Sequence, residues 1–160
     1  MSIHTPHSLN STGIRLPSDA FVVIVKTEWN ASILDQLASG ATKVLQEAGV
    51  SVDTITVPGA FEIPFAIKNY WESGESAQRP LAFIALGCVI RGDTPHFDYV
   101  CQAVTEGVLQ LNLLLPVPTI FGVLTVDNET QALERLGGRH GHKGEEAALT
   151  AVKMIALMKK

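Results

Sequence analysis

The sequence has little cysteine, no basic excess and no long apolar run. Its 160 residues include two cysteines, Cys88 and Cys101, whose separation fits no metal-binding or redox motif. We expect each to be a small buried hydrophobic residue rather than half of a disulfide. The formal net charge of −4 leaves no basic footprint of the kind that nucleic-acid-binding proteins carry.

Membrane-spanning and targeting segments are also missing. No apolar run reaches the roughly 18 residues of a membrane span, and no basic stretch followed by an apolar one opens the chain. Hydrophobic residues nevertheless make up 46% of the chain, against 18% charged residues. We therefore expect a soluble, cytoplasmic protein whose apolar surplus is buried at subunit interfaces as well as in a core.

The length of the chain indicates a single domain, since most domains have about 100–200 residues. Residues 1–17 are polar and carry few large apolar groups, so they are expected to form a flexible N-terminal arm. Residues 18–160 contain no internal repeat and no low-complexity block. They are expected to fold as one domain.

Apolar runs and periodic segments alternate along this domain. The runs, which suit strands buried on both faces, are residues 19–26, 50–57, 81–86 and 119–124. Helical spacing of apolar residues predicts helices over residues 31–48, 60–71, 95–115, 129–136 and from 145 onward, and Asn30, Thr94 and Asn128 are the expected caps. This order predicts an α/β fold, with a parallel sheet covered by helices on both faces.

Residues 87–96, Gly-Cys-Val-Ile-Arg-Gly-Asp-Thr-Pro-His, are interpreted as the turn between the third strand and its helix. Such turns lie at the carboxyl ends of parallel strands, where ligands of this architecture usually bind. Amides around Asp93 and Thr94, with the helix dipole, would form an anion site. His96 next to that site is then a candidate acid or base. The alternative is that Thr94 and Pro95 merely start a helix.

Two glycines in this turn imitate a different motif. Gly87 and Gly92 have the spacing of a phosphate-binding P-loop, but Asp93 follows where that motif needs lysine. An acidic residue there cannot neutralise a triphosphate. The sequence therefore excludes an ATPase or GTPase of this class.

The other strand ends also carry residues able to bind a ligand. Trp29 and Phe121 could sandwich a planar heterocycle, although aromatic residues there more often only cover the core. Glu62 could accept hydrogen bonds from a polyol or simply be stabilised by a helix dipole. Arg135 precedes two glycines and could hold phosphate in a bidentate fork. Their convergence at one sheet edge is the main argument for a site.

Four stretches resemble the 6,7-dimethyl-8-ribityllumazine synthases, which act in riboflavin biosynthesis. They are PGAFEIP (58–64), GCVIRGDTPHFDYV (87–100), FGVLT (121–125) and QALER (131–135), the last running into Lys143 and Gly144. The resemblance implies a flavodoxin-like three-layer sandwich with a four-stranded parallel sheet. It also implies condensation of 5-amino-6-(D-ribitylamino)uracil with 3,4-dihydroxy-2-butanone 4-phosphate, without a metal or redox cofactor.

The resemblance further assigns roles to individual residues. His96, as the proton donor, and Arg135, which holds phosphate, are the expected catalytic residues. The expected substrate-binding residues are Trp29, Ala60, Phe61, Glu62, Cys88, Val89, Ile90, Asp93, Thr94, Phe121 and Lys143. Trp29 would stack on the pyrimidine, and residues 88–90 would read it through backbone groups. Phe121 and Arg135 would come from the adjacent subunit.

Assembly and alternative functions stay open at this stage. The resemblance implies pentamers, either free or joined into shells of sixty subunits, and allows riboflavin synthase as a partner. One alternative is a ligand-binding shell that has lost catalysis, and another is a flavodoxin-type electron carrier with bound FMN. Retention of His96, Arg135, Trp29 and Phe121 favours the enzyme.

Overall fold

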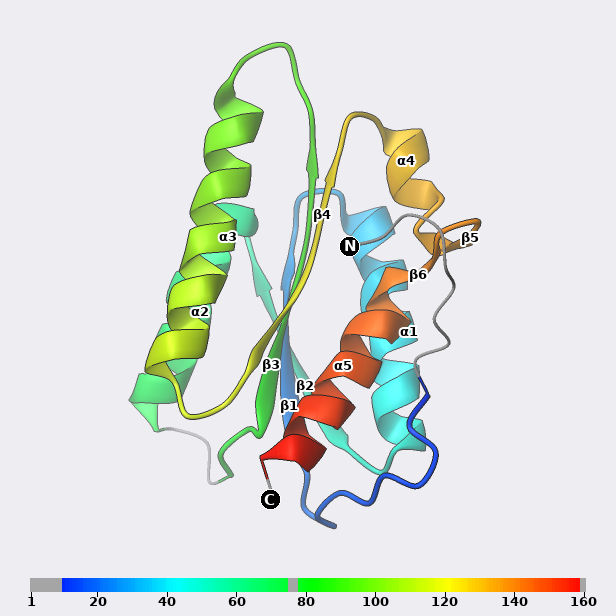
Figure 1. Ribbon diagram of the computed structural model, residues 1–160. Helices are drawn as coiled ribbons and strands as arrows, with labels where there is room; N and C mark the ends of the chain where they lie inside the picture. Colours follow the sequence, from blue (N-terminus) through cyan, green and yellow to red (C-terminus); the bar gives the residue numbers. More distant parts are fainter. Residues whose placement is uncertain (1–9, 75–77, 159–160) are drawn as a thin grey trace.

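A four-stranded parallel sheet forms the centre of the computed structural model, which describes residues 10–74 and 78–158 (Figure 1). The strand order is β2-β1-β3-β4. The strands are β1 (Phe21–Thr27), β2 (Ser51–Val57), β3 (Ala82–Ile90) and β4 (Thr119–Val126). The parallel pairing confirms the predicted sheet. β2 lies at the edge of the sheet and is mostly exposed, so the prediction that it is buried on both faces is wrong. However, β3 continues four residues beyond the predicted end at residue 86, so Cys88, Val89 and Ile90 belong to the strand rather than to the turn.

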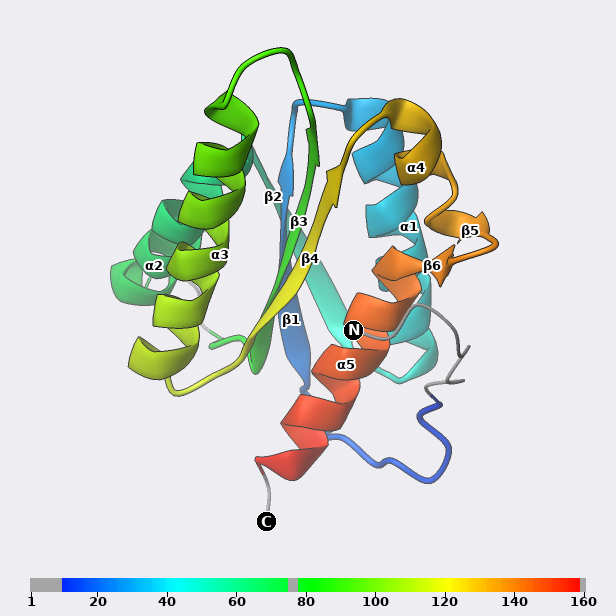
Figure 2. The ribbon, with the colours of Figure 1, turned by 45° about the horizontal axis from the view of Figure 1, so that its top comes forward.

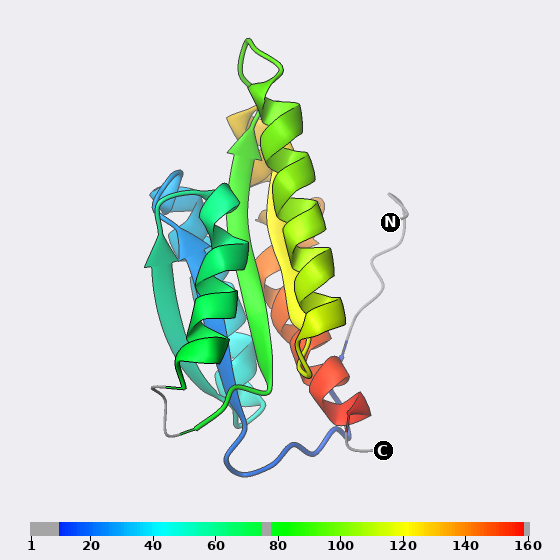
Figure 3. The same cartoon turned by 90° about the vertical axis from the view of Figure 1, so that its left-hand side faces the viewer.

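Helices cover both faces of this sheet and confirm the three-layer sandwich (Figures 1 and 2). On one face lie α1 (Ala31–Glu47) and α5 (Lys143–Leu157), and on the other lie α2 (Ile63–Ser73) and α3 (His96–Leu114). Figure 3 looks onto the α2 and α3 face. A single 3-10 turn, η1 (Ala60–Glu62), leads into α2.

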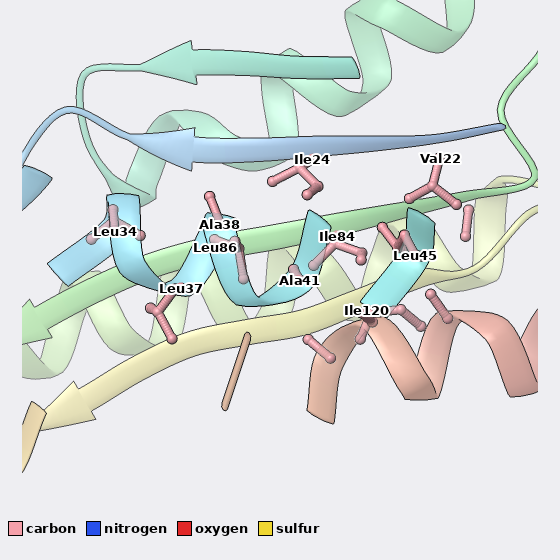
Figure 4. Close-up of a cluster of buried hydrophobic side chains, with 14 of the residues drawn as sticks. Val22, Ile24, Leu34, Leu37, Ala38, Ala41, Leu45, Ile84, Leu86 and Ile120 are labelled. Carbon is pink, nitrogen blue, oxygen red and sulfur yellow. The ribbon is translucent and has the colours of Figure 1, made fainter. Parts of the chain in front are cut away.

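The core consists of two layers, one on each face of the sheet, because successive strand residues point to opposite sides. Val22 and Ile24 of β1 face α1 and α5, whereas Val23 and Val25 face α2 and α3. Figure 4 shows the first layer, in which α1 side chains meet the sheet, among them Leu34, Leu37, Ala38, Ala41 and Leu45. This double burial explains why the central strands β1 and β3 are almost entirely apolar.

Part of the predicted N-terminal arm packs on this core. Residues 1–9 lie outside the described part of the chain, but Ile14 and Leu16 are partly buried against the α1 and α5 layer. The arm and the domain therefore meet before residue 17.

The region after β4 differs from the prediction in two ways. The short helix α4 (Glu129–Leu133) ends three residues before the predicted end at residue 136. The predicted turn 137–144 contains a small antiparallel hairpin of β5 (Leu136–Gly138) and β6 (Gly141–His142). The hairpin leads directly into α5, which begins at Lys143 rather than after Gly144.

The three predicted helix caps have different outcomes. Asn128 caps α4, and its side chain accepts a hydrogen bond from the amide of Gln131 at 3.0 Å. Asn30 occupies the cap position of α1, but its side chain makes no cap hydrogen bond. Thr94 is not a cap, because α3 begins at His96 and Pro95 precedes it directly.

Within the described residues, no helix is long and apolar enough to cross a bilayer.

Candidate active site

A cavity of about 720 Å³ opens at the carboxyl ends of β1 and β3. β2 and β3 lie on opposite sides of β1 in the sheet. The connection that follows β1 therefore runs to one side, and the connection that follows β3 runs to the other. Open α/β sheets bind ligands at such a switch point. Three segments line the cavity, namely residues 27–30, residues 58–62, and residues between 88 and 100.

Most of the site residues predicted from the sequence lie in this cavity. Nine of the thirteen line its wall: Trp29, Ala60, Phe61, Glu62, Cys88, Val89, Ile90, Thr94 and His96. Asp93, Phe121, Arg135 and Lys143 do not. Further lining residues are Thr27, Asn30, Pro58, Gly59, Gly92, Phe97 and Val100, none of which was predicted as a site residue. The sequence signal for them was their position beside residues already chosen at the strand ends.

Two exposed aromatic rings form one side of the cavity. Trp29 is 75% exposed and Phe61 is 63% exposed, so neither ring is part of the core. Trp29 is held by its backbone, because its amide donates to the Pro58 carbonyl at 3.3 Å and its carbonyl accepts from the Thr27 hydroxyl at 3.0 Å. A fixed but exposed indole is suited to stacking on a planar ligand.

The end of β3 forms the floor. The amide of Phe83 donates to the carbonyl of Pro118, directly before β4, and the amide of Arg91 donates to the carbonyl of Val126 in β4. Odd-numbered β3 residues therefore direct their backbone groups to β4 and even-numbered ones to β1. Because β1 ends at Thr27, Ile90 has no β1 residue opposite it. The backbone groups of Ile90 therefore face the opening, whereas those of Val89 face β4.

Cys88 lies on this floor as a buried, unpaired cysteine that is 5% exposed. Desolvation by burial, with a smaller effect of the Glu129 charge, raises the pKa of its thiol to about 11. The thiol is therefore protonated at neutral pH and is not a nucleophile.

The opposite side consists of the loop between β3 and α3. Thr94 and His96 line the cavity where α3 begins, and the amide-rich end of a helix attracts anions. Arg91 holds this loop: its guanidinium lies 4.1 Å from the centre of the Phe97 ring and donates to Asp127 at 2.9 Å and to Asp98 at 3.3 Å. The hydrogen bond with Asp127 is the main reason that the pKa of Arg91 is raised. Arg91 thus connects the loops after β3 and β4.

The remaining predicted residues lie elsewhere. Phe121 was expected at a strand end, but it is the third residue of β4 and pairs with Ala85, five residues before β4 ends. At about 3.3 Å per residue it is roughly 16 Å from that edge. Arg135 donates from Nη1 to the Gln131 carbonyl at 2.6 Å, and Lys143 pairs with Glu146 at 2.8 Å.

A metal site is not evident in the part of the chain that the structure describes. Across residues 10–74 and 78–158, no three His, Cys, Asp or Glu side chains converge as metal ligands would. His140 and His142 lie two positions apart in the β5–β6 hairpin, and they do not form part of such a group within these residues.

Comparison with known proteins identifies the family. Residues 19–159 match the family model of 6,7-dimethyl-8-ribityllumazine synthase. The chain is 51% identical over 142 residues to the 6,7-dimethyl-8-ribityllumazine synthase of Porphyromonas gingivalis, covering 87% of this chain and 86% of the relative. It is 48% identical over 141 residues to that of Parabacteroides distasonis, with 86% of both chains covered. The enzyme of the same name from Xanthomonas campestris is 43% identical over 145 residues, covering 89% of this chain and 92% of the relative. With these matches and the cavity at the expected strand ends, the chain belongs to the 6,7-dimethyl-8-ribityllumazine synthase family.

Proposed function

We propose that the cavity at the ends of β1 and β3 is the active site of a lumazine synthase, and that a neighbouring subunit completes it. As a member of its family the protein is a transferase of riboflavin biosynthesis. It condenses 5-amino-6-(D-ribitylamino)uracil with 3,4-dihydroxy-2-butanone 4-phosphate to 6,7-dimethyl-8-ribityllumazine. The observation that supports the location of this reaction is the convergence of nine predicted site residues on one cavity.

The pyrimidine substrate fits the side of the cavity between β1 and β3. The exposed Trp29 ring offers a stacking surface, and the unpaired backbone groups of Ile90 offer one donor and one acceptor for the pyrimidine edge. Glu62 lies on the same wall and can accept hydrogen bonds from ribityl hydroxyls. Phe61 and Ala60 supply the apolar surface beside them.

The phosphate substrate fits the start of α3. The Thr94 hydroxyl and the dipole of a 19-residue helix both favour an anion there. The carboxylate of Asp93 is exposed and does not line the cavity, so a role for this residue in binding depends on its backbone amide. Arg135 of a neighbouring subunit would neutralise the phosphate, with Lys143 near it.

The reaction requires orientation more than chemical activation. The 5-amino group of the pyrimidine adds to the ketone and loses water to form an imine, and phosphate leaves by elimination. The ribitylamino nitrogen then closes the ring with loss of a second water. His96 lies beside the phosphate position, where it can donate and accept the protons of these steps. Holding the two reactants together contributes the larger share of the rate, since orientation alone can be worth several kcal/mol.

A neighbouring subunit would supply the residues that this chain's cavity lacks. Phe121 is 42% exposed on β4, far from its own cavity, so its ring is available to another copy. Exposed apolar residues on α2 and α3, among them Phe65, Leu113 and Leu114, favour an assembly with buried faces. We propose a pentamer, alone or within a sixty-subunit shell, and riboflavin synthase as a partner. Free thiols at Cys88 and Cys101 fit the cytoplasm as its compartment.

A two-substrate assay tests this proposal. Phosphate release and lumazine absorbance are followed together with purified protein and both substrates, against a control without enzyme. Acceleration of both signals supports the active site, and a strong loss in Arg135→Ala with a moderate loss in His96→Ala supports the roles. A folded assembly that accelerates neither signal would instead be a ligand-binding shell.

A further inference from the structure

We propose that Asn30 is a positioning residue, whose side chain fixes the pyrimidine-binding part of the cavity by joining the turn after β1 to the backbone of β3. Its Nδ2 donates a hydrogen bond to the carbonyl of Cys88, 58 positions away, at 2.9 Å. Asn30 also lines the cavity directly after Trp29. This inference rests on the proposed pyrimidine site between Trp29 and the end of β3.

Asn30 departs from the backbone conformation and the side-chain hydrogen bond that are usual at a helix cap. Among the residues that the structure describes, Asn30 is the only one other than glycine with a positive φ, at φ 60° and ψ 39°. It occupies the cap position of α1, where an asparagine side chain normally accepts a hydrogen bond from the helix amides. Here that bond is absent, and the side chain turns to β3 instead. Asparagine tolerates the left-handed conformation better than most residues, which suits it to this position.

The sheet register explains what the side chain replaces. β1 and β3 pair regularly up to Lys26 and Leu86, and even-numbered β3 residues direct their backbone groups toward β1. Continuing this ladder by two residues would bring the Trp29 amide to the Cys88 carbonyl. Instead, the chain turns toward β2, and the Trp29 amide donates to the Pro58 carbonyl at 3.3 Å. The Asn30 side chain then provides the donor that the ladder has lost.

Two consequences for the site follow from this substitution of one donor for another. First, the bond to Cys88 holds the turn that carries Trp29 at a set distance from β3, so the stacking surface and the strand that reads the pyrimidine edge stay aligned. Second, the Cys88 carbonyl is occupied, which leaves the backbone of Ile90 as the main polar edge facing the pyrimidine. Asn30 thus acts on substrate through Trp29 and Cys88.

Three variants separate the hydrogen bond from the backbone conformation. Asn30→Asp keeps the shape and the tolerance for positive φ but replaces the donor by an acceptor. Asn30→Gly keeps the conformation and removes the side chain, whereas Asn30→Ala removes the side chain and disfavours the conformation. Asn128→Gly is the matched control, because Asn128 caps α4 and does not line the cavity.

The measurement is quenching of Trp29 fluorescence by 5-amino-6-(D-ribitylamino)uracil in a Trp71→Phe background, with KM for both substrates measured alongside. We expect the pyrimidine Kd to rise about tenfold in Asn30→Asp and less in Asn30→Gly, as a lost or reversed hydrogen bond in a shielded site predicts. The KM for the butanone phosphate and the Asn128→Gly control should change less than twofold.

The results distinguish a wrong active site from a wrong role for Asn30. If the protein with Asn30 intact does not bind the pyrimidine, the proposed active site is wrong. If it binds, but Asn30→Asp binds equally well and Asn30→Ala is the weakest, Asn30 matters only for backbone conformation and the positioning role is rejected. An equal rise in KM for both substrates in Asn30→Gly, whose conformation is unstrained, would reject it as well.

Discussion

Phe121 lies opposite Ala85 in the β3–β4 pairing, on the half of β4 that is remote from the cavity. An aromatic ring that is 42% exposed there contributes little to the core of its own chain. We therefore expect Phe121→Ala to weaken pyrimidine binding while the melting temperature of the isolated subunit falls only slightly. Parallel measurements of Kd and thermal unfolding check this. A large loss of stability with unchanged Kd would mean that the ring is structural.

Trp29 should contribute mainly by stacking. Stacking of a base on an aromatic ring is worth about 1–3 kcal/mol, so Trp29→Ala should raise the pyrimidine KM by roughly 5- to 150-fold. Trp29→Phe retains a ring and should stay close to the original value. Trp71→Phe is the control, since Trp71 packs from α2 against Phe83 of β3 and does not line the cavity. Equal KM values in Trp29→Ala and Trp29→Phe would contradict stacking.

His96 should affect turnover rather than binding. A positioned general acid or base typically contributes about 100- to 10,000-fold, and here orientation carries much of the rate, so His96→Gln should lower kcat near the smaller end of that range. KM for both substrates should change little, because glutamine keeps a polar group at the start of α3. Steady-state kinetics with each substrate varied in turn provides the test. A KM effect without a kcat effect would reassign His96 to binding.

The sequence patterns predicted the sheet, the helices and most of the cavity for physical reasons that particular residues show. Strands such as 21–27 are buried on both faces, so their apolar runs leave no ambiguity. The end of β3 was missed because Gly87 interrupts the apolar run, and because Cys88, Val89 and Ile90 pair with β4 residues 36 positions later. Asn30 was predicted only as a cap, since the residues around it do not indicate a hydrogen bond to the carbonyl of Cys88. The position of Phe121 followed from register, which the sequence does not reveal.

The pH dependence of Cys88 has a defined sign. Burial raises its folded-state pKa to about 11 from an ordinary value of 9.0, and the protonated thiol is the form that the folded state favours. Its contribution to stability is therefore fully present below pH 9 and is lost as the pH rises toward 11. We expect chemical denaturation to show this loss in the unmodified protein and a smaller loss in Cys88→Ala.

Thiol labelling gives an independent check of the same burial. Iodoacetamide at neutral pH should modify Cys88 much more slowly than the partly exposed Cys101 in the native protein. In denaturant both should react at similar rates. Fast native labelling of Cys88 in a Cys101→Ala background would show that the thiol is accessible.

The contact between α1 and α5 depends on glycine. A Cβ at Gly144 would overlap the carbonyl oxygen of Leu37, which is backbone and cannot move aside easily. Gly144→Ala should therefore lower the free energy of unfolding by about 1–3 kcal/mol, as overpacking usually does. Gly92→Ala is the control, because a Cβ there meets no atom within 4 Å and the φ is not in the left-handed region. Equal denaturation midpoints for the two variants would contradict close helix packing.

Complementation between defective subunits tests the central claim, that one subunit's cavity is completed by another subunit. Trp29→Ala/His96→Ala damages the cavity, and Arg135→Ala damages the residue offered to a neighbour. Co-assembly of the two from denaturant, in equal amounts, should restore activity to about one quarter of the native value, because about one site in four then combines two intact halves. The control pair, Trp29→Ala/His96→Ala with Thr94→Ala, should restore none, since both carry their defects in the same cavity. If mixed assemblies of the first pair stay as inactive as the control, each chain uses its own Arg135 and the shared site is refuted.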